Sequence, residues 1–217
     1  TPTRPNGWDD GGTYKRMHRH TWNDVQWQPR NTWLTCFNGI NSANRVISQI
    51  ESGSLPISEE QAASVIAELR GVRAVYYSIL LDTHGNVPII KNFSDEVPTQ
   101  ASRSEVYNFI ISELNEVIPM LTETADQTTY GRLNKWGALA LQARVYLNAE
   151  VYVGTAEWDK VISNTDQIIN SGAYMLDDNY RDVFSTDNQN SPEIVFSVPY
   201  DRLYGPEWNQ HMKQLLP

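Results

Sequence analysis

The residues best suited to carry chemistry lie close together near the start of the chain. Asp9 and Asp10 form an acidic pair among aromatic residues, and hydrolysis of a glycosidic bond needs two facing carboxylates, one protonated and one ionised. Adjacent side chains usually point apart, so the pair is better suited to stabilise a turn before the two glycines that follow. His18 and His20 can bind a metal together with either aspartate, but two histidines without a spaced third ligand are a weak signal. We therefore expect no catalytic residue and no metal site.

Composition excludes several other classes of function. The chain has 217 residues, a net charge of -9 and a pI near 4.9, whereas nucleic-acid binding requires clustered Lys and Arg. The single cysteine, Cys36, excludes an internal disulfide framework and a cysteine-based zinc site. No phosphate-binding loop, dinucleotide glycine fingerprint or nucleophile-elbow motif occurs. We expect no nucleic-acid partner and no cofactor.

Aromatic residues outside the predicted helices indicate a binding surface instead. Pyranose rings stack their C–H faces on aromatic rings, while polar side chains hydrogen-bond the sugar hydroxyls. The alternative is that these rings pack beneath loops as small satellite cores. Polar residues that can supply hydrogen bonds flank the first tryptophan. The predicted glycan-binding residues are Arg4, Asn6, Trp8, Asp9, Trp22, Trp27, Tyr204 and Trp208.

A long central helix is expected to organise the elements that position these loops. Ser58 with Gln61 three residues later is a capping box, which predicts a helix that starts at Glu59. Apolar residues then recur at three- and four-residue spacing, and additional apolar positions widen the stripe, so other helices should pack on both sides. Gly85 can take the left-handed conformation that ends a helix, and Pro88 favours an extended exit.

Four further helices are predicted around the central one. Each combines a helical apolar period with a residue that can cap its first turn. Trp33, Trp136 and Trp158 fall at positions that should face the core. The predicted caps are Asn31 or Thr32 for a helix from Trp33, Ser102 with Glu105, Asn134, and Thr155 for a helix closed by Gly172. After that glycine the pattern changes, and the run from Glu193 to Val198 has the composition of a strand.

The central stretch resembles the hallmark of the SusD/RagB family, an LRA-x-YY-x-x-L helix followed by YG-x-VP-L. His84 stands where the family usually has Tyr. The early run that ends in His20 and Trp22 resembles the family's WYDGG-x-W segment, and Ser171 to Tyr174 resembles its SG-x-Y ending. The positions matched in the hallmark are Leu69, Arg70, Arg73, Ala74, Tyr76, Tyr77, Leu80, Gly85, Val87 and Pro88.

This resemblance implies a mainly all-α fold, a superhelix of tetratricopeptide-like helix hairpins with irregular, loop-rich ligand-facing segments. We expect residues 1–32 to be an irregular ligand-facing segment, 33–172 a helical-repeat core, and 173–217 a strand and loop segment. The resemblance also implies a non-catalytic protein that binds oligosaccharide or polysaccharide and delivers it to a SusC-like TonB-dependent transporter.

The expected location is the extracellular face of the outer membrane. No apolar run approaches the roughly 18 residues of a membrane span, and the first residues lack a signal-peptide core. Because the family's members are lipoproteins, the resemblance implies that this chain is an internal portion of a longer protein whose lipid anchor lies outside it. Two alternatives remain open: a helical-repeat interaction module without a small ligand, and a carbohydrate-active hydrolase that uses the acidic pair.

Overall fold

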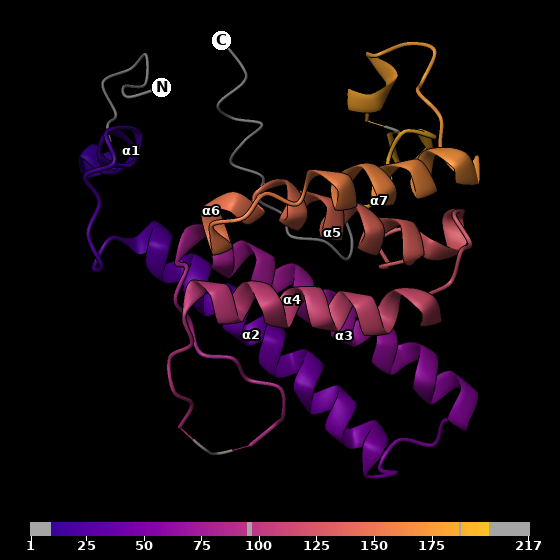
Figure 1. Ribbon diagram of the computed structural model, residues 1–217, viewed down its shortest axis with the longest axis horizontal. Helices are drawn as coiled ribbons and strands as arrows, with labels where there is room; N and C mark the ends of the chain where they lie inside the picture. Colours follow the sequence, from indigo (N-terminus) through magenta and orange to yellow (C-terminus); the bar gives the residue numbers. More distant parts are fainter. Residues whose placement is uncertain (1–9, 95–96, 187, 200–217) are drawn as a thin grey trace.

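The protein is a stack of α-helices in the computed structural model, which describes residues 10–94, 97–186 and 188–199. The chain runs back and forth, so that α2 and α3 form the lower layer of Figure 1, followed upward by α4, by α5 with α6, and by α7. The helices are α1 (Thr13–His18), α2 (Trp27–Glu51), α3 (Glu59–Thr83), α4 (Arg103–Val117), α5 (Lys135–Leu147), α6 (Ala149–Val153) and α7 (Trp158–Ser171). Short 3-10 turns cover Asp10–Gly12, Ile118–Met120, Gln127–Thr129, Asp182–Phe184 and Asn188–Asn190. The expected mainly α-helical fold is confirmed.

Local capping signals set most of the helix starts as predicted. Ser58 accepts a hydrogen bond from the backbone N–H of Gln61, whose side chain bonds back to the Ser58 N–H, and Ser102 forms the same capping box. Asn134 caps α5 through the backbone N–H of Gly137. Gly85 has a φ of 74°, the left-handed conformation that ends α3.

Two predicted helix starts are wrong. The first long helix begins at Trp27 with Gln26 as its N-cap, not after Asn31 or Thr32, because the helical turns extend back through a Pro-containing first turn that tolerates the missing N–H. The last helix begins at Trp158 after Glu157, and Thr155 does not cap it. In both cases the apolar period was correct, but the cap residue was not.

The central position predicted for α3 is confirmed. Its side chains Tyr77 and Leu80 have no exposed surface, and α3 packs against both α2 and α4. The α2–α3 contact is close at Gly39, where a Cβ atom would overlap the ring of Tyr76. Rings continue across the layers, with Phe37 of α2 edge-on to Tyr77 and Tyr77 edge-on to Phe109 of α4, at centroid distances of 6.4 and 5.0 Å.

The strand predicted from Glu193 is wrong for the part of the chain that the structure describes. Residues 193–199 are turns and irregular backbone, because no described segment pairs with them. Within the described ranges, bridge pairing is limited to an isolated antiparallel bridge between Pro88 and Gln100, in the connection between α3 and α4.

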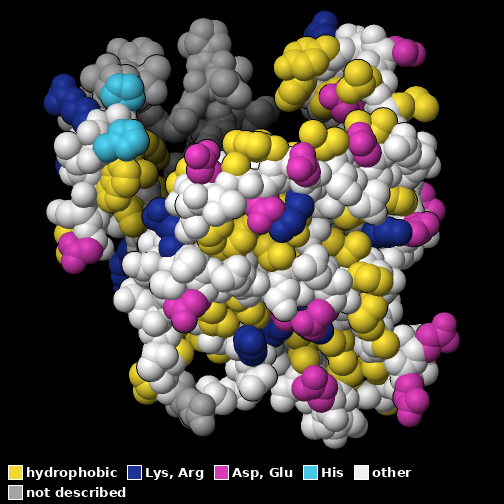
Figure 2. Space-filling view, viewed as in Figure 1, with side chains coloured by type: hydrophobic (Ala, Val, Ile, Leu, Met, Phe, Trp, Pro, Cys, Tyr) yellow, Lys and Arg dark blue, Asp and Glu magenta, His cyan; other side chains and the backbone are white. Residues whose placement is uncertain are grey.

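The outer face of α7 is more exposed than its sequence predicts. Trp158, Ile162 and Ile169 are 50%, 57% and 70% exposed, so the expectation that Trp158 faces the core is wrong. The helical period identifies the apolar stripe correctly, but α5 covers only one edge of it. Hydrophobic and charged side chains are interspersed over the face of the molecule seen in Figure 2. Among the described residues, no helix is long and apolar enough to cross a membrane.

Trp136→Ala should lower the free energy of unfolding by about 3–5 kcal/mol, because it removes a buried indole and its Nε1 hydrogen bond to the Glu123 carbonyl. Trp158→Ala is the matched control, an indole on the neighbouring helix that is half exposed, and should cost roughly 1 kcal/mol or less. Urea denaturation followed by circular dichroism measures both. Equal losses would contradict this difference in burial.

Candidate functional site: an exposed aromatic segment on a rigid helical frame

A short aromatic segment that runs from α1 to the first turn of α2 contains the described part of the predicted binding surface. Gly11 and Gly12 have φ values of 64° and 75°, so the chain turns there and enters α1. Arg16 then braces the segment: Nε donates to Oε1 of Gln26 at 2.9 Å, Nη1 donates to the Gly11 carbonyl at 2.9 Å, and Nη2 donates to Thr13. One guanidinium therefore joins the turn before α1 to the N-cap of α2.

Two of the predicted tryptophans lie exposed on this segment. Trp22 and Trp27 are 42% and 44% exposed, and the Trp22 ring contacts the His20 ring at a centroid distance of 5.3 Å. An indole left partly in water retains a face on which an apolar ligand surface can stack. The other predicted binding residues lie outside the described residues: Arg4, Asn6, Trp8, Asp9, Tyr204 and Trp208.

Two glutamines beside Trp27 were missed by the sequence reasoning. Gln26 is 6% exposed, and its Nε2 has no hydrogen-bond partner among the residues that the structure describes. Both polar atoms of the Gln28 side chain are also buried without a described partner. Buried amides are normally paired, so these atoms have hydrogen-bonding capacity that no described residue uses, beside an exposed indole. The available signal was an amide on each side of a tryptophan in the sequence.

The start of α2 is fixed to the helical stack by a second set of ring contacts. Trp33, less than two turns after Trp27, packs on Phe37 at 4.7 Å and edge-on to His84 at 5.4 Å between ring centroids. His84 lies at the end of α3, so these contacts join the aromatic segment to the central helix. In the described part of the chain, no group of three or more His, Cys, Asp or Glu side chains can hold a metal ion.

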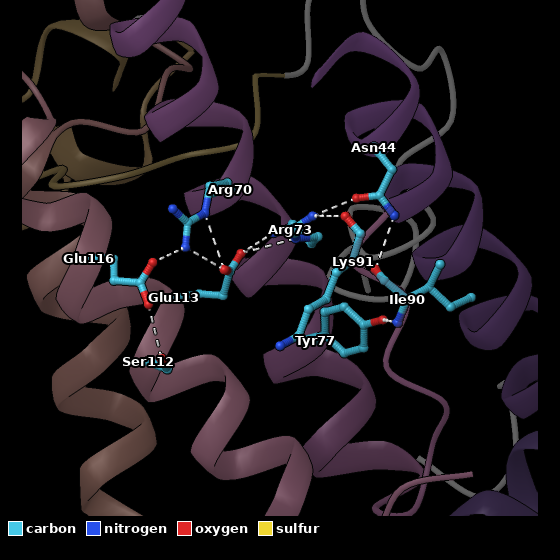
Figure 3. Close-up of polar contacts among 9 residues, drawn as sticks. All are labelled: Asn44, Arg70, Arg73, Tyr77, Ile90, Lys91, Ser112, Glu113 and Glu116. Carbon is cyan, nitrogen blue, oxygen red and sulfur yellow. Dashed lines mark hydrogen bonds and ion pairs between the residues drawn. The ribbon is translucent and has the colours of Figure 1, made fainter. Parts of the chain in front are cut away.

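A buried ion-pair network lies at the centre of this frame (Figure 3). Glu113 of α4 accepts from Nε of Arg73 at 3.1 Å and also pairs with its Nη2, and its other oxygen accepts from Nη2 of Arg70 at 2.7 Å. Arg73 and Glu113 are 4% and 5% exposed. Nη1 of Arg73 donates to Oδ1 of Asn44 in α2 at 2.6 Å and to the Lys91 carbonyl at 2.7 Å. The network therefore joins three helices and the connection that follows α3.

Two groups beside this network have shifted pKa values. The hydrogen bond from Arg70 holds the pKa of Glu116 below its ordinary value. Burial raises the pKa of Tyr77 to about 12, and its hydroxyl donates to the Pro88 carbonyl and accepts from the N–H of Ile90 at 2.7 Å. Asn44 donates to the Ile90 carbonyl at 3.0 Å, so the backbone after α3 is held from both sides.

These features define a helical scaffold that presents exposed aromatic side chains on a short segment at one end. A family described as "Starch-binding associating with outer membrane" matches residues 4–147, which is more than half of the chain. The starch-binding protein SusD of Bacteroides thetaiotaomicron is 31% identical over 186 residues, which cover 82% of this chain and 33% of that protein. The chain belongs to the SusD-like family, as its sequence motifs predict.

Solved structures agree with this assignment. A laminarin-binding SusD-like protein superposes with a TM-score of 0.74 at 26% identity, over 86% of this chain and 41% of that one. Surface glycan-binding protein A from Bacteroides thetaiotaomicron, in complex with laminarihexaose, has a TM-score of 0.66 at 23% identity, which shows the shared fold, over 78% of this chain and 35% of that one. The chain spans about a third of the length of the curated relatives that it matches.

Glu113→Gln should lower the free energy of unfolding by roughly 3–5 kcal/mol, because it leaves the buried Arg73 charge without its counter-charge. Glu116→Gln is the matched control on the same helix, since that carboxylate is exposed and pairs with Arg70 at the surface. Its denaturation midpoint should stay close to that of the wild type. Chemical denaturation of both variants tests this, and a small effect of Glu113→Gln would show that the pair does not support the frame.

Proposed function

We propose that the protein binds oligosaccharide or polysaccharide at the cell surface through the exposed aromatic side chains of its loop segments. The observation that supports this most is the pair of exposed indoles, Trp22 and Trp27, on a segment braced by Arg16. A rigid aromatic platform loses little conformational freedom when a sugar ring stacks on it, so more of the contact energy appears as affinity. Family membership supports the same ligand class.

In this proposal, different parts of the chain contact the ligand and support the ligand-facing segments. Residues 1–32, which include α1 and the start of α2, and residues 173–217 supply the ligand-facing segments. Residues 33–172 form the frame that holds them. Arg4, Asn6, Trp8 and Asp9, together with the tail residues Tyr204 and Trp208, complete the proposed glycan contacts. The role is binding without turnover, because Asp9 and Asp10 are adjacent in sequence and not separated as a hydrolytic carboxylate pair requires.

The proposed setting is the extracellular face of the outer membrane, with a lipid anchor outside this chain. The bound glycan is handed to a SusC-like TonB-dependent transporter. The helical face is the proposed contact with that transporter, because stacked helices offer a large rigid surface. The exposed apolar stripe of α7, with Trp158, Ile162 and Ile169, favours this face, since large exposed apolar patches often mark interaction sites.

Trp22→Ala and Trp27→Ala should each weaken binding of laminarihexaose or a starch oligosaccharide about tenfold, because each removes a stacking face worth roughly 0.5–1.5 kcal/mol beyond burial. Trp158→Ala, a half-exposed tryptophan on α7, should leave affinity unchanged. Calorimetry measures the affinity, circular dichroism confirms folding, and the sugars should be recovered uncleaved. Unchanged affinity in both the Trp22 and the Trp27 variant would refute the platform.

Charge reversal on the helical face should weaken co-purification with the transporter. Asp159→Lys and Asp166→Lys place positive charges on exposed positions of α7, beside the apolar stripe. Asp182→Lys, on an exposed 3-10 turn of the loop region, is the control and should leave the complex intact. If the α7 variants co-purify normally while the loop variant does not, the contact lies on the loop side.

A further inference from the structure

A cleft of about 630 Å³ lies between α2 and α4, with α3 as its floor. Asn44, Ile47 and Ser48 of α2 line one wall, and residues of α4 from Glu105 to Glu116 line the other. The connection after α3 closes one end with Lys91, Asn92 and Phe93. This volume lies within the range of roughly 300–1,000 Å³ that is typical of small-ligand sites. Figure 3 shows the ion pairs that form its floor.

The lining of the cleft carries three positive and four negative side chains, so its charges nearly cancel. Arg70 and Arg73 are paired with Glu113 and Glu116, two positive charges with two negative ones. Around this floor, the Lys91 ammonium lies 5.4 Å from the centre of the Phe109 ring, while Glu51 and Glu105 add carboxylates to the lining. An anionic ligand would meet these carboxylates, and a cationic ligand would meet Lys91 and the arginines. Both kinds of ion lose hydration without gaining a dominant counter-charge.

The remaining lining offers hydrogen-bond donors and acceptors and an exposed aromatic ring. Ser48 and Asn92 carry groups that both donate and accept, as a ligand hydroxyl does, and Ser112, whose hydroxyl donates to Glu116, can still accept. The Phe93 ring is 57% exposed at the closed end, and apolar walls are formed by Ile47, Ile66 and Ile89. A sugar ring has hydroxyls that can hydrogen-bond the polar side chains of the lining and C–H faces that can pack on its aromatic and apolar side chains.

We propose that this cleft is a second ligand site, separate from the aromatic segment, that takes a neutral, hydroxyl-rich ligand such as a short saccharide. The floor is fixed before binding, because Arg70 and Arg73 are held by Glu113, and Asn44 is held by Arg73 and the Ile90 carbonyl. Binding therefore does not have to order these side chains. The site is formed by α2, α3, α4 and the connection after α3, and it does not depend on Trp22 or Trp27.

The test is an amide-resolved NMR titration of the full chain with glucose and with laminarihexaose. Saturable shifts should appear in residues 44–51, 89–93 and 105–116, and they should persist in the Trp22→Ala/Trp27→Ala double variant. Phe93→Ala should raise the dissociation constant obtained from these shifts roughly fivefold. Phe184→Ala, which changes another exposed phenylalanine, should leave it unchanged. Ser112→Trp should block the cleft, and Ser163→Trp, at an exposed position of α7, is the control for bulk.

Each outcome separates this site from the proposed aromatic platform. Absence of shifts in the cleft, or equal binding by Ser112→Trp and wild type, overturns the second site and leaves the platform standing. Cleft shifts that persist while the tryptophan variants lose no affinity support the second site and refute the platform. Titration with glucuronate and with ethylammonium completes the test, since a response to either ion in place of the neutral sugars overturns the proposed ligand class.

Discussion

The ion pair between Arg73 of α3 and Glu113 of α4 is the interaction on which the rest of the frame depends. Removing two charges from water costs several kcal/mol, and a buried pair is tolerated when further hydrogen bonds satisfy its remaining polar atoms. Here those bonds come from Arg70, from Asn44 of α2 and from the Lys91 carbonyl. The hydrogen bonds that satisfy the two buried charges therefore also fix the positions of three helices and of the connection after α3.

Ring contacts and one arginine hold the aromatic segment in a fixed position against this frame. Trp33 packs against Phe37 and His84, which fixes the beginning of α2 relative to the end of α3. Arg16 then links Gln26, at the start of α2, to the turn before α1 through hydrogen bonds to both. The two exposed indoles are thus held by elements whose own rings are packed. Stacking surfaces held in this way suit ligands that are themselves stiff, as pyranose rings are.

Local signals in the sequence predicted much of the fold, and long-range contacts account for what it did not predict. The capping box at Ser58 and the left-handed Gly85 involve only neighbouring residues, so they could be predicted directly. The pairing of Arg73 with Glu113 spans 40 residues, and no spacing rule marks it. Periodicity located the apolar stripe of α7 without showing what covers it. At the site, tryptophan exposure could be anticipated, whereas the bracing by Arg16 was not, because its partners lie three, five and ten residues away in a segment without a regular period.

The close approach of α2 and α3 at Gly39 couples two positions that are far apart in the sequence. A Cβ atom at position 39 would overlap the Tyr76 ring, because that ring fills the space left by the missing side chain of Gly39. Substitution at either position is therefore constrained by the other: a side chain can appear at 39 only where the residue at 76 is smaller or its ring moves away. Across relatives, the two columns should vary together, as a record of how tightly this pair of helices is packed.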